Sequence, residues 1–286
     1  MTATLMSGTD LAGRIRAEVA EEVQELGEIG LATVQVGEDP ASTIYLRRKH
    51  EAAAEAGIRS VDHKLPAEVS EKELLGVVAE LNDDDAIDGI LVQLPLPGHL
   101  DEARVIVAVD PLKDVDGFHP FNAGQLYLGR PTHVPATPLG IMALLAEHRI
   151  ELEGARAVVV GRSDIVGKPI AHLLLQSNAT VTICHSRTEE LERHTLDADV
   201  LVVAAGVAGI VSAEMVKSGA TVVDVGINRT DAGIVGDVDS GAVGRAGHLT
   251  PVPGGVGPMT IAMLLRNTLR AARYRRGVLA FPQTRR

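Results

Sequence analysis

The stretch Val158-Val159-Val160-Gly161-Arg162-Ser163-Asp164-Ile165-Val166-Gly167-Lys168-Pro169 decides how the chain folds. It runs from an apolar strand through a glycine-bounded loop to a proline, which suits the first helical turn because its missing N–H would be unpaired there. The pattern predicts a phosphate-binding turn. It fits neither G-x-G-x-x-G nor the GxxxxGK[ST] loop, since five residues separate the two glycines and a proline replaces the hydroxyl residue. Taken alone, an ordinary strand-to-helix turn explains it equally well.

The composition fits a chain of two domains. At 286 residues and 45% hydrophobic, the chain can bury a large core, and its length favours two domains over one. Asp10, Arg14 and Arg16 stand where a secretory signal would be apolar, and no uncharged apolar run could span a bilayer. We therefore expect a cytoplasmic protein without a membrane partner. The lone Cys184 can form no internal disulfide, which suits a reducing compartment.

The charge is strongly negative but unevenly distributed. A formal net charge of −11 argues against nucleic acid as a partner, because a polyanion would meet an unfavourable field. No Asp or Glu follows Asp239. A solvated helix and tail explain the C-terminal arginines better than a dedicated anion-binding patch does. These arginines are Arg266, Arg270, Arg273, Arg275, Arg276, Arg285 and Arg286.

Apolar periodicity predicts an α/β fold. The first part of the chain alternates strand and helix in the order βαβαβ, which predicts a parallel sheet. The expected elements are strand 31–36, helix 41–56, strand 58–65, helix 70–81 and strand 87–94. Proline and glycine then dominate residues 95–138, and so long an irregular region is more often functional than idle.

A second parallel αβ pattern follows a helix expected from Leu139 to about His148. The expected elements are strand 157–160, helix 169–176, and strands 179–184, 200–204 and 221–225. A last helix, 259–274, has apolar spacing that suits packing on the first part of the chain.

The end of the second strand of this pattern indicates the dinucleotide. An NAD site commonly has Asp or Glu there, to bind the adenosine ribose. This chain has Ser186 and Arg187 instead, whose donors suit a ribose 2′-phosphate. NADP is therefore favoured over NAD. Arg162 offers a second cation from the neighbouring loop; the alternative is a surface arginine paired with an acidic residue. Backbone N–H groups of residues 163–167 could meet the pyrophosphate.

A second group of candidate residues lies outside this pattern. Helical spacing puts Tyr45 and Lys49 on one face of a helix. Gln93 ends an apolar strand, where parallel sheets bind ligands, and Asp116 lies in a loop bounded by prolines. Each also has a purely structural explanation, such as an amphipathic surface helix, a strand cap or a solvated turn. The backbone-rich loop 251–260 could be only a helix entry.

Together these segments resemble the bifunctional methylenetetrahydrofolate dehydrogenase/methenyltetrahydrofolate cyclohydrolase family. The resemblance covers nearly the whole chain. After the Ser42/Tyr45/Lys49 helix it includes VQLPLP (92–97), KDVDGFHP (113–120), TPLG (137–140), VVGRSDIVGKP (159–169), VDVGIN (223–228) and PGGVGPMT (253–260). It implies two domains with parallel-rich sheets and a cleft between them. The catalytic, folate-binding domain would be 1–138 plus 259–286, and the Rossmann-like NADP domain 139–258. A homodimer is also implied.

The resemblance assigns roles to particular residues. It makes Lys49 the catalytic lysine and Gln93 its contact. Tyr45 would stack on the folate, and Asp116 would hold the pterin nitrogens, as a carboxylate can. The remaining implied contacts are Pro253 and Gly254 with folate, Gly161, Arg162 and Ser163 with NADP, Ser186 with its 2′-phosphate, and Ile227 near the nicotinamide.

The implied chemistry uses tetrahydrofolate one-carbon derivatives and needs no metal. Methylenetetrahydrofolate is oxidised with NADP, and the methenyl product is hydrolysed to 10-formyltetrahydrofolate. Lys49 can assist proton transfer only if burial lowers its pKa. Two alternatives stay open: a monofunctional NADP-dependent dehydrogenase of the same fold, and a non-catalytic NADP-binding protein. A dehydrogenase of the shikimate or amino-acid type is more distant, because the 92–97 and 253–260 segments oppose it.

Overall fold

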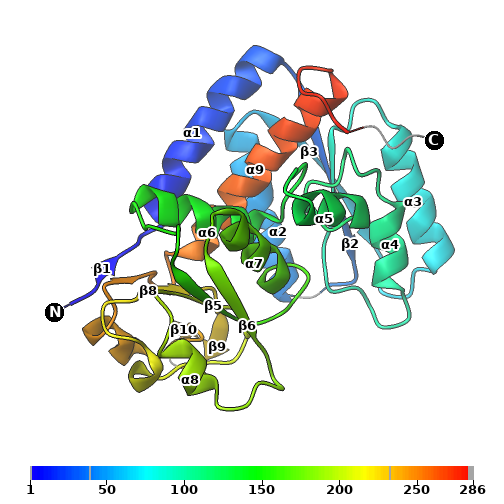
Figure 1. The fold of residues 1–286 in the computed structure, drawn as a ribbon. Helices are drawn as coiled ribbons and strands as arrows, with labels where there is room; N and C mark the ends of the chain where they lie inside the picture. Colours follow the sequence, from blue (N-terminus) through cyan, green and yellow to red (C-terminus); the bar gives the residue numbers. More distant parts are fainter. Residues whose placement is uncertain (1, 39, 232, 283–286) are drawn as a thin grey trace. The chain divides into compact units, whose positions relative to one another are not determined.

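The computed structural model describes residues 2–38, 40–231 and 233–282, without the side chains of residues 40–44. Arg285, Arg286 and the side chain of Ser42 therefore lie outside the described residues. The chain divides into two compact units (Figure 1). The three-stranded unit comprises residues 14–136 and the segment from Ile261 onward. The six-stranded unit comprises the N-terminal segment through Gly13 and residues 137–260.

The three-stranded unit confirms the parallel sheet predicted from the βαβαβ order. Its strands pair in the order β3-β2-β4, and both pairings are parallel. Its elements are α1 (Thr9–Leu26, which begins in the other unit), β2 (Ile29–Val36), α2 (Pro40–Glu55), β3 (Ile58–Leu65), α3 (Glu71–Asp83), β4 (Gly89–Val92), α4 (Glu102–Ala108), α5 (Pro120–Tyr127) and α9 (Val256–Arg275, which also begins in the other unit).

The sequence explains how these elements begin and where they pack. All eight residues of β2 are buried, as expected for the central strand of a sheet covered on both faces. Helix α3 starts at a capping box, in which the Glu73 N–H donates to the Ser70 hydroxyl and the Glu73 carboxylate accepts from the Ser70 N–H. Leu74 and Val78 on its apolar face pack against residues of β2 and β4 in one hydrophobic core.

The expectation of a wholly irregular region from 95 to 138 is wrong in part. Two short helices, α4 and α5, lie within it. Asp101 caps α4 by accepting from the Ala103 N–H at 3.0 Å, and Pro120 stands in the first turn of α5. Helix α1 is a further element that the apolar spacing did not identify.

The six-stranded unit has the order β1-β11-β8-β7-β5-β6, and every pairing in it is parallel. A separate antiparallel hairpin joins β9 and β10. The elements are β1 (Thr4–Leu5), α6 (Ala136–Glu147, which starts at the division), β5 (Arg156–Val160), α7 (Gly167–Gln176), β6 (Thr180–Cys184), α8 (Leu191–Thr195), β7 (Val200–Val203), η1 (Ala213–Met215), β8 (Thr221–Asp224), β9 (Asn228–Thr230), β10 (Gly233–Val235), η2 (Ser240–Gly244) and β11 (His248–Leu249).

The boundaries of the two units differ from the domain boundaries predicted from the sequence. The sequence divides the chain at 138/139 and 258/259, whereas the contacts divide it after Gly13, Ala136 and Thr260. The main difference is the N-terminal segment. Strand β1 pairs with β11, with Thr4 opposite His248, and this pairing ties the segment to the six-stranded sheet.

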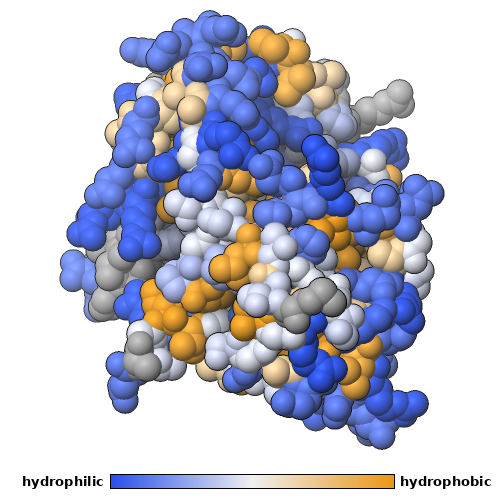
Figure 2. All heavy atoms as spheres, turned by 90° about the vertical axis from the view of Figure 1, so that its left-hand side faces the viewer, coloured by the Kyte–Doolittle hydropathy of each residue, from blue (hydrophilic) through white to orange (hydrophobic). Residues whose placement is uncertain are grey.

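The surface is mixed in character. Figure 2 shows hydrophilic groups over much of one face, with apolar groups in patches between them. No helix within the described ranges combines the length and apolar composition needed to cross a membrane.

Candidate functional site

Lys49 and Gln93 form the centre of a candidate active site in the three-stranded unit. Lys49 lies on α2 and is only 7% exposed, and Gln93 directly follows β4. The Lys49 Nζ donates to the Gln93 Oε1 at 3.3 Å. The other end of the same amide, Nε2, donates to the Leu94 carbonyl at 2.8 Å. Because that bond fixes the orientation of the amide, its oxygen faces the lysine.

Tyr45 stands one helical turn before Lys49 on the same face of α2. The Lys49 Nζ lies 4.9 Å from the centroid of the Tyr45 ring, within cation–π range. The spacing of four residues places ring and amine side by side, as the sequence predicted.

Asp116 interacts electrostatically with Lys49, and burial shifts both groups. Burial lowers the pKa of Lys49 below its usual value of 10.5, while the Asp116 carboxylate opposes that shift. Burial raises the pKa of Asp116 to about 7, with Asp114 adding to the rise and Lys49 opposing it. Part of the Asp116 surface is nevertheless accessible. Burial thus moves the pKa of each group toward neutral pH.

The loop that carries Asp116 is organised by Asp114, which the sequence analysis did not single out. The buried Asp114 carboxylate accepts from the N–H groups of Gly117 at 3.0 Å and His119 at 2.8 Å, and from the Asn122 amide at 2.8 Å. Gly117 has φ +71°, and a Cβ there would lie 2.8 Å from the Val134 carbonyl carbon. Asp followed three residues later by Gly is a turn signal that could have revealed this role.

Helix α2 is anchored to the sheet by a second buried group that the sequence did not reveal. The wholly buried Thr33 hydroxyl lies 3.0 Å from His50 Nε2 and donates to Asp62 Oδ1 at 2.9 Å. His50 is the neighbour of Lys49, so this link from β2 and β3 helps to fix the position of the lysine.

In the six-stranded unit, the glycine-bounded loop is shaped by close backbone packing. Gly161 has φ +132°, and a Cβ on it would lie 2.2 Å from the Ala204 carbonyl oxygen. A Cβ on Gly167 would lie 2.4 Å from the Gly161 carbonyl oxygen. No other residue fits either position. The unusual spacing is therefore a packing requirement, and it leads directly into α7.

Polar side chains gather where the adjacent parallel strands β5 and β6 end. Val160 pairs with Cys184, and the Gly161 N–H donates to the Cys184 carbonyl at 2.9 Å. Arg162 and Ser163 follow β5, and Ser186 and Arg187 follow β6; all four are exposed. Neither arginine forms an ion pair with any described residue, so the alternative that Arg162 pairs with an acid is not observed. Exposed guanidinium and hydroxyl donors fit the phosphates of a dinucleotide.

Ser163 has a second role within this turn. Its hydroxyl accepts from the N–H groups of Val166 at 3.2 Å and Gly167 at 3.3 Å. Lys168 pairs with Asp164. The turn is thus held by its own side chains.

Three further predicted residues also belong to the six-stranded unit. Ile227 follows β8 and is 60% exposed, which is unusual for an isoleucine. Pro253 and Gly254 precede α9. Gly254 has φ +105°, and its carbonyl accepts from the Gly8 N–H at 2.8 Å. The structure therefore groups Tyr45, Lys49, Gln93 and Asp116 in one unit. It places Ile227, Pro253 and Gly254 with the glycine-bounded loop in the other.

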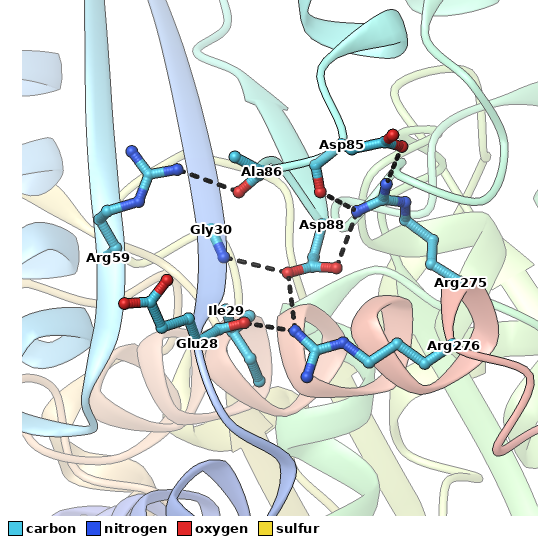
Figure 3. A pocket seen from close by; sticks show the side chains of 9 residues that line it. All are labelled: Glu28, Ile29, Gly30, Arg59, Asp85, Ala86, Asp88, Arg275 and Arg276. Carbon is cyan, nitrogen blue, oxygen red and sulfur yellow. Dashed lines mark hydrogen bonds and ion pairs between the residues drawn. The ribbon is translucent and has the colours of Figure 1, made fainter.

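A pocket of about 340 Å³ lies elsewhere in the three-stranded unit, at the amino ends of its strands (Figure 3). Arg275 and Arg276 of the α9 end point toward Asp88 from one side, and Asp88 also accepts from the Gly30 N–H at 3.1 Å. Arg59 donates to the Ala86 carbonyl at 3.0 Å. The charged groups of this pocket are largely paired with one another, and it lies at the strand ends opposite Gln93.

The solvated helix that the sequence predicted for the C-terminal arginines is found in part among the described residues: Arg266 and Arg276 are exposed, whereas Arg270, Arg273 and Arg275 are half-buried. Arg266 pairs with Glu18 at 2.8 Å, and Arg273 pairs with Glu22. Arg275 pairs with Asp88 at 2.8 Å. These contacts join α9 to α1 and to the start of β4.

No described residues form a group of three or more His, Cys, Asp or Glu side chains that could hold a metal ion.

Comparison with protein families gives two matches in series. A model described as the tetrahydrofolate dehydrogenase/cyclohydrolase catalytic domain matches residues 6–116. A model described as the NAD(P)-binding domain of the same enzymes matches residues 135–276.

Individual relatives are similar to this chain over almost their full length. "Bifunctional protein FolD" of Halothermothrix orenii is 54% identical over 94% of this chain and 98% of its own. The crystal structure of the bifunctional FolD enzyme of Campylobacter jejuni is similar with a TM-score of 0.94 and 47% identity, covering 96% of this chain and 99% of that one. The Trypanosoma brucei enzyme, solved with NADP cofactor and inhibitor, has a TM-score of 0.92 and 40% identity over 98% and 100%.

Proposed function

Because this chain belongs to the tetrahydrofolate dehydrogenase/cyclohydrolase family, we propose that Lys49 is its catalytic lysine and Gln93 the residue that orients it. The chain is a bifunctional methylenetetrahydrofolate dehydrogenase/cyclohydrolase of folate one-carbon metabolism, and its cofactor is NADP. The observation that carries the residue assignment is the buried contact from Lys49 Nζ to Gln93 Oε1 at 3.3 Å, beside the Tyr45 ring.

Folate recognition is assigned to Asp116 and Tyr45. An ionised Asp116 can accept paired N–H bonds from the pterin, and its desolvation makes those charge-assisted bonds strong. The Tyr45 ring offers a flat face for stacking. Pro253 and Gly254 of the six-stranded unit are proposed as further folate contacts, with a backbone that Gly254 allows to turn sharply.

The NADP site is assigned to the carboxyl ends of β5, β6 and β8. Gly161 and Ser163 shape the loop for the pyrophosphate, and Arg162 adds positive charge. Ser186 offers its hydroxyl to the 2′-phosphate, with Arg187 beside it. The exposed Ile227 offers an apolar surface to the nicotinamide. When bound, NADP supplies the hydride acceptor for oxidation of methylenetetrahydrofolate, and these residues contribute alignment.

The second reaction, hydrolysis of the methenyl cation, is assigned to Lys49. Burial lowers the lysine pKa, so its neutral form can take a proton from the water that attacks the one-carbon bridge. The resulting ammonium can return that proton to the pterin nitrogen as its bond to the bridge breaks. The hydroxyl on the bridge loses its proton to solvent, which leaves 10-formyltetrahydrofolate. Gln93 orients the amine without adding a negative charge that would keep it protonated.

One coupled assay tests the assignment of both reactions. We expect absorbance of NADPH and of the methenyl compound to rise together from methylenetetrahydrofolate, and the methenyl signal then to decay at an enzyme-dependent rate. Parallel runs with NAD in place of NADP test the 2′-phosphate contacts. Equal efficiencies with both dinucleotides would contradict the roles of Ser186 and Arg187, and uncatalysed methenyl decay would contradict that of Lys49.

The assembly and cellular setting are proposed as a cytoplasmic homodimer. Strand β6 pairs only with β5 in the described sheet, and its Ile183 is 42% exposed, so its free edge could pair with a second copy. Light scattering that gives a monomer mass would contradict the dimer. The buried lone Cys184 suits a reducing compartment. The net charge of −11 disfavours a nucleic-acid partner, and salt-dependent DNA binding would contradict that proposal.

A further inference from the structure

The six-stranded unit contains a wholly buried carboxylate, Asp237, that lies two residues after β10. Its Oδ2 accepts from the N–H groups of Ala205 at 2.7 Å and Gly206 at 2.8 Å. Its Oδ1 accepts from the Asn228 side-chain amide at 2.8 Å. Three donors therefore converge on one side chain, and a desolvated carboxylate needs such donors to remain ionised.

These donors come from two segments that follow adjacent strands. Ala205 and Gly206 lie in the loop after β7, and Asn228 is the first residue of β9, at the end of the loop that follows β8. The two strands are adjacent and parallel, with Val203 opposite Asp224. Asp237 thus ties together two loops at the carboxyl edge of the sheet, the edge at which open parallel sheets bind ligands.

The loop after β7 in turn contacts the glycine-bounded loop. The Ala204 N–H donates to the Val160 carbonyl at 2.8 Å, and the Ala204 carbonyl occupies the space that a side chain at Gly161 would need. A displacement of residues 204–206 would therefore change the packing around Gly161 directly.

The loop after β8 is equally tight around Asp237. A Cβ on Gly226 would lie 2.3 Å from both the N and the Oδ1 of Asp237. Ile227, which is 60% exposed, is the next residue. A second buried carboxylate, Asp224, accepts from the N–H groups of Gly226 and Asp237, both at 2.9 Å, and so fixes the backbone on which Asp237 stands.

We propose that Asp237 is a positioning residue for the NADP site, whose carboxylate holds the loops after β7 and β8 in the arrangement that receives the dinucleotide. The proposal rests on the NADP site proposed above. Asp237 does not contact the cofactor in this role, because it is buried and its oxygens already accept three bonds. It acts through Ala204–Gly206 on Gly161, and through Gly226 on Ile227.

The test is Asp237→Asn, which keeps the shape but replaces one acceptor oxygen with a donor. At least one of the three N–H groups then loses its acceptor, and we expect the Kd for NADP, measured by calorimetry, to rise about tenfold or more. Amide hydrogen exchange at Ala205 and Gly206 should accelerate. Hydrolysis of methenyltetrahydrofolate without nucleotide should stay within about twofold of the unaltered enzyme, because Lys49 belongs to the other unit.

Asp239→Asn is the matched control. Asp239 is an exposed aspartate two residues further on, and its carboxylate accepts from the Gly241 N–H at 2.7 Å as the cap of η2. We expect NADP affinity to be unchanged in this variant. A second variant, Gly226→Ala, keeps the Asp237 charge but displaces its side chain, and should reproduce the NADP defect.

Unchanged NADP affinity in folded Asp237→Asn would overturn the proposal. So would equal loss of NADP binding and methenyl hydrolysis in both Asp237→Asn and Gly226→Ala, since that result would assign Asp237 to general stability. If the unaltered protein itself fails to bind NADP, the proposed cofactor site is wrong, and that outcome is separate from any effect of the variants.

Discussion

The two edges of the three-stranded sheet use charged residues in opposite ways. At the amino edge, Asp88 is met by Arg275 and Arg276 and by the Gly30 N–H. At the carboxyl edge, Lys49 is buried against a neutral amide, and Asp116 is desolvated so that its pKa rises to about 7. Paired charges hold the fold together, whereas incompletely compensated charges remain available to a ligand. We therefore interpret the amino edge as a structural ion-pair cluster and the carboxyl edge as the candidate active site.

The largest expected effect concerns Lys49. Lys49→Met should reduce methenyl hydrolysis about a thousandfold, because it removes the proton carrier at similar volume. NADP affinity should be unchanged, and this is the control measurement. Unaltered hydrolysis would remove the chemical distinction between the two edges.

The next effect is on stability, at the amino edge. Asp88→Asn removes the buried carboxylate that pairs with Arg275 and leaves that arginine only the exposed Asp85 as an acidic partner. It should lower the free energy of unfolding by about 3 kcal/mol, measured by urea denaturation. The catalytic rates of the folded variant should not change. Arg104→Ala is the matched control, since its pair with Glu71 is 64% exposed on the arginine side and should contribute under about 1 kcal/mol. Equal losses in the two variants would show that burial of the pair does not matter.

The smallest effect, and the sharpest in its pH dependence, belongs to Asp116. Asp116→Asn should raise the folate KM about tenfold at pH 8, where the native carboxylate is ionised. The difference should shrink as the pH falls below about 7, because the native side chain then becomes protonated. A KM ratio that is independent of pH would contradict a pterin contact by the ionised form.

Asp116→Asn weakens folate binding at high pH but should make the folded protein relatively more stable there. The pKa of Asp116 is higher in the folded than in the unfolded chain, so folded protein binds more protons between about pH 4 and 7. The native free energy of unfolding should therefore fall relative to Asp116→Asn as the pH rises through that range. Urea denaturation at several pH values measures the difference.

Local sequence patterns predicted much of the fold. Strand β3 has the predicted bounds Ile58–Leu65, because Gly57 before it and Pro66 after it mark its ends. The Lys49–Gln93 contact was expected from the family resemblance and is present. Helices α4 and α5 were missed because the residues that mark their starts, the cap Asp101 and the first-turn Pro120, are equally common in turns.

Long-range pairing explains what the sequence could not reveal. Asp88 and Arg275 are 187 residues apart, and nothing near either residue predicts the other. The role of the Asp237 carboxylate could not be read from the sequence either, since an aspartate in a loop is ordinarily solvated. Only the folded chain shows that it receives three N–H donors.

The three-stranded unit needs the side chains of α9, and this affects the order in which the two units fold during synthesis. Glu18, Glu22 and Asp88 leave the ribosome long before their partners Arg266, Arg273 and Arg275. Until then Asp88 would be a carboxylate without its arginines, and the Val115 and Val134 carbonyls would lack the amide of Asn267. The six-stranded sheet is complete at β11, before α9 begins. Translation order therefore favours folding of the six-stranded unit first, with the unit that carries Lys49 completed only after α9 has been synthesised.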